Sequence, residues 1–110
     1  MRTTLLLPYT VEVPDGEPST EYVFEVSVLL EQERGAWVLG DYEVRRLLSV
    51  CLYYRKQGAE FEPADSIEDS ECWQRLAPKL VEWFERKLDA SAALQSELVR
   101  LAVEREGASV

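Results

Sequence analysis

The amino-acid sequence predicts an α+β domain in which a three-stranded antiparallel meander is followed by three helices packed on one face of the sheet. Two observations lead to this prediction. Apolar and polar residues alternate over much of residues 3–39, which is the pattern of strands with one face in water. Beyond residue 40, apolar residues recur every three or four positions, which is the helical period. A run of strands followed by a run of helices is typical of α+β folds.

The length and composition are those of one folded domain. A chain of 110 residues is long enough to bury a core without a disulfide framework. Its apolar share of 46% is normal for a globular protein, so composition gives no sign of disorder. We therefore expect a single domain over residues 1–107, with residues 108–110 as a frayed C-terminal tail.

The first half of the chain supplies the predicted strands. Residues 3–14 alternate strongly, and because Pro8 cannot donate a hydrogen bond, this strand is expected at an edge of the sheet or with a bulge. Residues 21–32 are the clearest strand, with one apolar face and one acidic face. The short turn Glu33-Arg34-Gly35 leads into a third strand at residues 36–39.

Residues 41–57 are predicted to form the first helix. Asp41 suits an N-cap, and Gly58 suits the position after the last turn. The apolar residues of this segment recur at i, i+3, i+4, i+7 and i+8; they are Val44, Leu47, Leu48, Cys51 and Leu52. A strand is the alternative, because Val50, Leu52 and Tyr54 also alternate.

Residues 59–71 are expected to form an acidic loop, and residues 70–88 a second helix with a stripe of large apolar side chains. Pro78 lies inside this stripe. It either kinks one continuous helix, which the unbroken stripe favours, or begins a second short helix. Ser91 can cap a last helix that ends at Gly107.

The charged composition limits the functions that this chain can perform. It has no histidine, the commonest general acid/base and metal ligand near neutral pH, so we expect no catalytic site, no metal site and no cofactor. Twenty-one acidic residues against 12 basic ones give a net charge of -9, which opposes direct binding of nucleic acid. Cys51 and Cys72 lack zinc spacing and are expected as reduced thiols in the core.

Several local patterns have an ordinary structural interpretation. Carboxylates are abundant enough that an acid pair or a calcium loop among residues 65–71 is less expected than a solvated acidic surface. Residues 44–56 contain four basic residues and no acidic one. This segment is expected to pair internally, with Arg45 and Arg46 answering the acidic loop at residues 60–71, rather than to bind phosphate.

These observations favour a non-catalytic acidic protein-binding module. Its most specific form is an inhibitor that imitates nucleic-acid phosphates and occupies a basic groove of a target protein. The candidate partner-binding residues are Glu21, Glu25, Glu31, Glu60, Glu62, Glu68, Asp69 and Trp83. The alternative is a small self-associating structural or assembly subunit, which would be a homodimer or larger, with apolar contacts such as Trp83, Tyr53 and Tyr54.

The chain is expected to be cytoplasmic, because no apolar run approaches the length of a membrane span and its first residues lack a cleavage site. It has no Asn, a single Ile at position 67, and three Lys against nine Arg. Such a bias is what a GC-rich genome produces, which suggests a phage or bacterial source.

Overall fold

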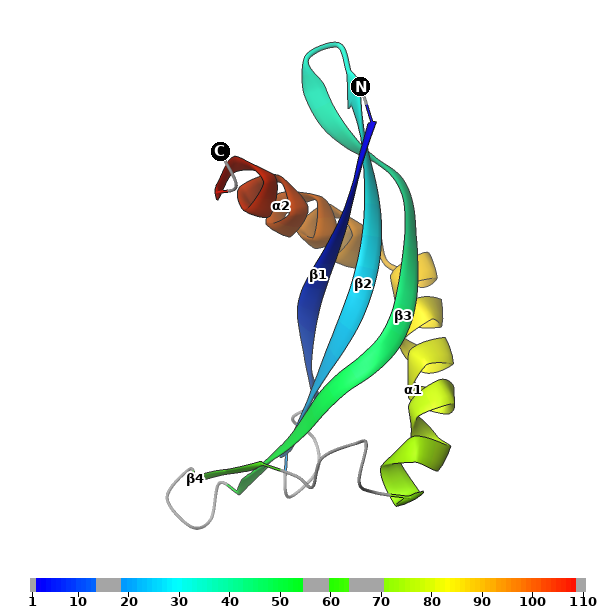
Figure 1. Cartoon of the computed structure of the whole chain (residues 1–110), viewed down its shortest axis with the longest axis vertical. Coiled ribbons are helices and arrows are strands. Elements are labelled where there is room, and N and C mark those ends of the chain that lie inside the picture. The colour runs from blue at the N-terminus through cyan, green and yellow to red at the C-terminus, as the bar shows by residue number, and fades with distance from the viewer. Residues whose placement is uncertain (1, 14–18, 55–59, 64–70, 109–110) are drawn as a thin grey trace.

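The computed structural model describes residues 2–13, 19–54, 60–63 and 71–108 (Figure 1). Three long strands come first, then a short strand and two helices. In chain order the elements are β1 (Arg2–Val13), β2 (Ser19–Glu33), β3 (Ala36–Tyr54), β4 (Glu60–Pro63), α1 (Glu71–Ala90) and α2 (Ala92–Ala108).

The strands form an antiparallel sheet in the order β1-β2-β3-β4. Both helices pack on the same face of this sheet, and α2 crosses behind the strands while α1 lies beside β3 (Figure 1). We call the opposite face of the sheet its open face. The α+β class and the three-stranded meander are therefore confirmed, whereas the prediction of three helices is wrong, because the described chain has two after the sheet.

β1 is an edge strand, as Pro8 indicated. It pairs with β2 in one unbroken register from Arg2↔Glu31 to Val13↔Thr20, without a bulge. The hairpin between β2 and β3 turns at Arg34 and Gly35, whose φ angles are 51° and 81°. Two successive positive φ angles are typical of the tight turn that matches the twist of a hairpin. Glycine is the residue expected where φ is positive, and Arg34 adopts a positive φ although it is not a glycine.

The helix predicted for residues 41–57 is wrong for residues 41–54, which belong to β3 (Ala36–Tyr54) and confirm the strand alternative. Residues 55–57 lie outside the described residues. The physical reason for the wrong prediction is a series of bulges. The register of β3 against β2 shifts at three places, and at each of them one residue of β3 has no partner on β2; these residues are Gly40, Arg45 and Leu48.

Each bulge inserts one residue into the alternation, so the side chains that face the helices are spaced by two or three positions. They are Leu39, Tyr42, Val44, Leu47 and Val50. A repeat near three resembles the helical period, and this resemblance explains the wrong prediction. Gly40 is required at its bulge, since a Cβ there would lie 2.8 Å from Cγ of Glu31.

The core lies between β2 and the two helices. Phe24, Val26, Val28 and Leu30 of β2 are fully buried, and each contributes about 1.5–3 kcal/mol by leaving water. Phe84 of α1 stacks on Phe24, with ring centroids 4.7 Å apart. α2 adds Leu98 and Ala102, which are also fully buried. α1 and α2 are thereby held on the sheet.

The two helices begin and end close to the expected residues. α1 continues through Pro78 as one helix. Ser91 separates α1 from α2, and its Oγ accepts a hydrogen bond from the backbone N–H of Leu94 at 3.2 Å, which confirms it as the N-cap of α2. The segment expected as a loop at residues 59–71 contains β4, which pairs with residues 51–54 of β3.

Within the described residues, neither helix combines the length and the apolar character that crossing a membrane requires.

Candidate functional site

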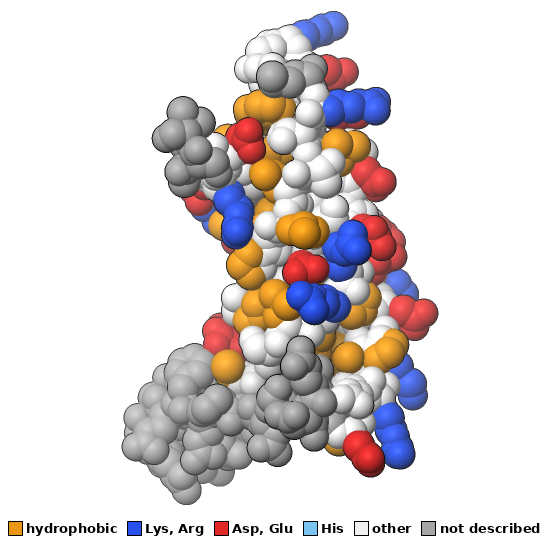
Figure 2. Space-filling model, in the orientation of Figure 1, with side chains coloured by type: hydrophobic (Ala, Val, Ile, Leu, Met, Phe, Trp, Pro, Cys, Tyr) orange, Lys and Arg blue, Asp and Glu red, His pale blue; other side chains and the backbone are white. Residues whose placement is uncertain are grey.

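The carboxylates predicted on β2 are largely compensated by arginines of the neighbouring strands. The side chain of Glu25 lies 3.4 Å from Arg46 and 4.0 Å from Arg45, and that of Glu31 lies 3.0 Å from Arg2. Figure 2 shows charged side chains of both signs gathered at the middle of the sheet, between separate apolar patches. Arg45 and Arg46 therefore pair internally with Glu25 of β2. Their expected pairing with the acidic segment at residues 60–71 falls mostly on side chains outside the described residues.

The remaining predicted carboxylates lie in different parts of the chain. Glu21 is half-buried on β2 opposite Cys51. Glu60 and Glu62 lie on β4, where the backbone alone is described, and Glu68 and Asp69 lie outside the described residues. Their contact with a partner stays a prediction.

Trp83 is half-buried in an aromatic cluster of this chain. Its ring meets Tyr22 of β2 edge-to-face at 6.1 Å, and Tyr22 meets Trp73 in the same way at 6.5 Å. Nζ of Lys87 lies 4.7 Å from the centre of the Trp83 ring. Because Tyr22 and Lys87 already contact its ring, Trp83 has less free surface for a partner than a fully exposed tryptophan would have.

A second group of carboxylates gathers around Tyr42, where β3 meets α1. The phenol O–H of Tyr42 donates to Oδ1 of Asp89, and its backbone N–H donates to Oδ1 of Asp41 at 2.8 Å. Glu85, one turn of α1 before Asp89, adds a third negative charge that acts on the phenol. We call Asp41, Glu85 and Asp89 the acidic surface.

The negative charges of this group act on the phenol of Tyr42. Burial, the hydrogen bond to Asp89 and the charges of Asp89, Glu85 and Asp41 together raise the pKa of Tyr42 to about 12. In the described part of the chain, no Lys or Arg nitrogen comes within the 4.0 Å of an ion pair with these three carboxylates. Arg86 lies nearby, and it lines a small pocket together with Glu82, Glu85 and Asp89. The carboxylates of the acidic surface are therefore less compensated by basic side chains than the carboxylates of β2.

The raised pKa of Tyr42 makes stability depend on alkaline pH. The folded state holds the neutral phenol more strongly than the unfolded chain does, so the contribution is complete below pH 10 and is lost as pH rises from about 10 to about 12. We expect the free energy of unfolding to fall over this range, and to fall less in Tyr42→Phe. Urea titrations of both proteins at several pH values measure this difference, and parallel curves would contradict it. Tyr9 and Tyr22, whose pKa values burial also raises, account for the slope that stays in the variant.

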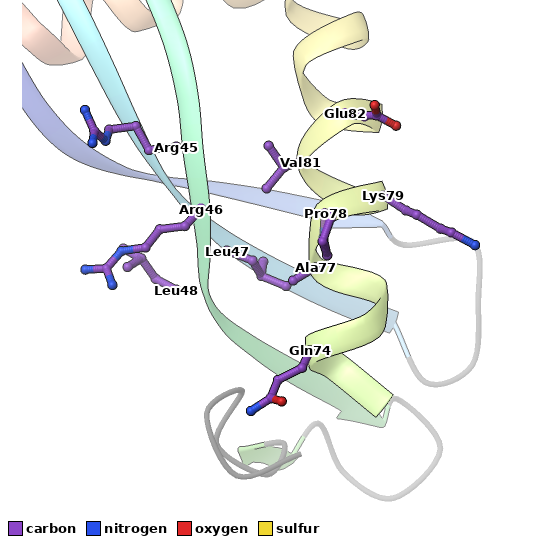
Figure 3. A pocket seen from close by; sticks show the side chains of 10 residues that line it. All are labelled: Arg45, Arg46, Leu47, Leu48, Gln74, Ala77, Pro78, Lys79, Val81 and Glu82. Carbon is purple, nitrogen blue, oxygen red and sulfur yellow. The ribbon is translucent and has the colours of Figure 1, made fainter. Parts of the chain in front are cut away.

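A groove of about 960 Å³ lies between β3 and the first half of α1. Its inner walls are apolar, since Leu47 points toward Ala77, Pro78 and Val81 (Figure 3). Arg45, Arg46 and Leu48 project on the other side of β3, and Lys79 and Glu82 point outward from α1 (Figure 3). The groove is missed by sequence reasoning, because it depends on residues 45–48 being a strand.

The described residues offer little for metal or thiol chemistry. They contain no group of three or more Asp, Glu, Cys or His side chains arranged to hold a metal ion. Cys51 and Cys72 are both free thiols, as expected; Cys51 is half-buried, but Cys72 is exposed on α1 and not in the core. Its exposure follows from the orientation of α1, which turns Trp73 and Ala77 toward the sheet.

No protein-family model, no curated protein and no solved structure matches this chain. What the protein does is therefore inferred from its own residues.

Proposed function

We propose that the protein is a non-catalytic protein-binding module that presents the acidic surface to a basic partner. The observation that carries this proposal is the convergence of Asp41, Glu85 and Asp89 on Tyr42 from two different elements. Charges fixed on a strand and a helix attract a partner without the entropy cost of ordering a flexible tail. A potential of one sign over such a surface raises the rate of association with an oppositely charged protein.

Because arginines compensate the carboxylates of β2, the centre of the proposed interface moves from β2 to the acidic surface. Glu25 and Glu31 would have to leave their arginines before they could bind basic side chains of a partner. Asp41, Glu85 and Asp89 have no such competitor among the described residues. Glu21, Glu25 and Glu31 then contribute to the long-range field of the net charge of -9 more than to direct contacts.

In its most specific form, the module is an inhibitor that occupies the nucleic-acid-binding groove of its target. A phosphate imitator needs carboxylates held at fixed positions, and the hydrogen bonds to Tyr42 hold two of them, Asp41 and Asp89. Such a target binds either this protein or nucleic acid, so DNA or RNA added to the complex should displace the protein.

The binding proposal predicts the effect of removing the three charges of the acidic surface. We expect the triple variant Asp41→Asn, Glu85→Gln, Asp89→Asn to bind the partner at least about tenfold more weakly, because each fixed charge at a basic interface contributes on the order of 0.5–1 kcal/mol. The partner is first isolated from lysate by affinity capture at low salt, and its affinity for each variant is then measured by calorimetry.

The matched control is Glu12→Gln, Glu97→Gln, Glu104→Gln, which removes the same number of charges from exposed positions on β1 and α2. Both triple variants change the net charge from -9 to -6, since each loses three negative charges. Equal loss of affinity in the two variants would mean that only the total charge matters, and the acidic surface would not be the interface.

The alternative function is that of a self-associating structural or assembly subunit. The open face favours it, because Leu6 of β1 is 50% exposed there and its diagonal neighbour on β2 is Leu29. Two copies packed through this face would cover both leucines.

A charge at Leu6 tests self-association. If the protein is a dimer through the open face, Leu6→Glu should convert it to a monomer in sedimentation experiments, because the interface would bury an unpaired charge. Leu76→Glu, on the 39% exposed leucine of α1, is the control and should leave the dimer intact. A wild-type monomer at high concentration would exclude this alternative.

A further inference from the structure

We propose that the groove between β3 and α1 binds an extended peptide of alternating acidic and apolar residues, which adds as a strand to the free edge of β3. This site is separate from the acidic surface, so it can fail or succeed independently of the function proposed above. Four features of the structure lead to it.

The first feature is the edge itself. β4 pairs with β3 over only four residues, from Cys51↔Pro63 to Tyr54↔Glu60. The same edge of β3 continues from residue 50 back to residue 36, and no described strand pairs with it there. Beyond β4, this edge presents further backbone donors and acceptors, and an added strand would have to follow the bulges of β3 at Arg45 and Leu48. The new strand would continue the track of β4.

The second feature is the apolar wall that faces this edge. Leu47 of β3 points across the groove toward Ala77, Pro78 and Val81 of α1 (Figure 3). Side chains of an added strand point alternately to the two faces of the sheet. Every second side chain of the peptide would therefore enter the groove, whose volume of about 960 Å³ accommodates several apolar side chains.

The third feature is the positive charge on the open face of the sheet. The bulge at Arg45 places Arg45 and Arg46 together on the open face, where both approach Glu25. Within the described residues, the two guanidinium groups share the carboxylate of Glu25, so their positive charge is partly compensated. The peptide side chains that do not enter the groove would lie on the open face, beside Arg45 and Arg46. Carboxylates at these alternate positions would pair with the positive charge of the two arginines. The sequence of β4, Glu60-Phe61-Glu62-Pro63, has this alternation of acidic and apolar residues.

The fourth feature distinguishes this edge from the other edge of the sheet. β1 also has a free edge, but Pro8 lies in its middle and lacks an N–H. A proline there interrupts the row of donors and opposes the addition of a strand. β3 contains no proline between Ala36 and Tyr54, so no residue of this strand lacks a backbone N–H.

The test is a titration of the full, isotope-labelled chain with a short capped peptide of alternating Glu and Val, followed by amide NMR shifts. We expect the shifts to be confined to residues 44–50 of β3 and to the α1 residues that line the groove. The same peptide with Lys in place of Glu should bind at least about tenfold more weakly, because it places like charges beside Arg45 and Arg46.

Two variants keep the result interpretable. Val81→Glu adds a charge to the groove wall and should abolish binding of the Glu-Val peptide, whereas Leu76→Glu on another side of α1 should leave it unchanged. An amide spectrum of each variant without peptide establishes that it is folded. The proposal is overturned if the peptide shifts β1 or the acidic surface instead, if the Lys peptide binds equally well, or if no residue of the groove responds.

Discussion

Replacing Phe84 with alanine should lower the free energy of unfolding by about 3–5 kcal/mol, which is more than most single substitutions cost a protein. Phe84 is fully buried and stacks between Phe24 at 4.7 Å and Tyr9 at 5.5 Å. It therefore joins α1 to the two strands β1 and β2. Removing its ring leaves a cavity at this junction, and the loss is a large share of the roughly 5–15 kcal/mol that stabilises a typical domain.

Equilibrium unfolding in urea measures this effect. Leu76→Ala is the control on the same helix, because Leu76 is 39% exposed and its substitution should change the free energy of unfolding by less than about 0.5–1 kcal/mol. A loss below about 1 kcal/mol in Phe84→Ala would mean that α1 does not pack on the sheet through this ring.

The second large effect distinguishes the bulged strand from the helix that the sequence suggests for residues 41–57. Leu47 and Leu48 are adjacent, and a helix with the predicted stripe would bury both. In β3, Leu47 is 5% exposed and Leu48, at a bulge, is 38% exposed. We expect Leu47→Ala to cost about 2–5 kcal/mol and Leu48→Ala less than about 1 kcal/mol.

The same urea titrations give both values, and each variant is the control for the other. Similar losses in Leu47→Ala and Leu48→Ala would indicate that both side chains are in the core, which a strand with this register does not allow.

Much of the sheet could be predicted from the sequence because its residues follow one period. β2 alternates without interruption along its whole buried face, and Pro8 correctly indicated an edge strand. β3 could not be predicted in the same way. Its bulges at Gly40, Arg45 and Leu48 change the spacing of the buried residues, and a bulge depends on the partner strand, which one segment of sequence does not reveal.

The candidate site is harder to predict than the fold, for a related reason. The excess of acidic residues is visible in the composition. Whether a given carboxylate is paired with a basic side chain depends on which residues the fold brings next to it. The alternation of β2 points to Glu25 and Glu31, whereas the arginines that pair with them come from β3 and β1. Glu85 and Asp89 are absent from the predicted site, although their spacing places them one turn apart on α1. Their approach to Tyr42 follows only once residue 42 is assigned to a strand that contacts this helix.

The central claim is that the acidic surface mediates binding, and the salt dependence of association tests it most directly. The association rate of the captured partner is measured against ionic strength for the wild type, for the variant Asp41→Asn, Glu85→Gln, Asp89→Asn and for the matched control. We predict a steep fall with salt for the wild type and the control, and a shallower fall for the acidic-surface variant. Identical slopes for all three proteins, or a wild-type rate that does not respond to salt, would contradict the claim.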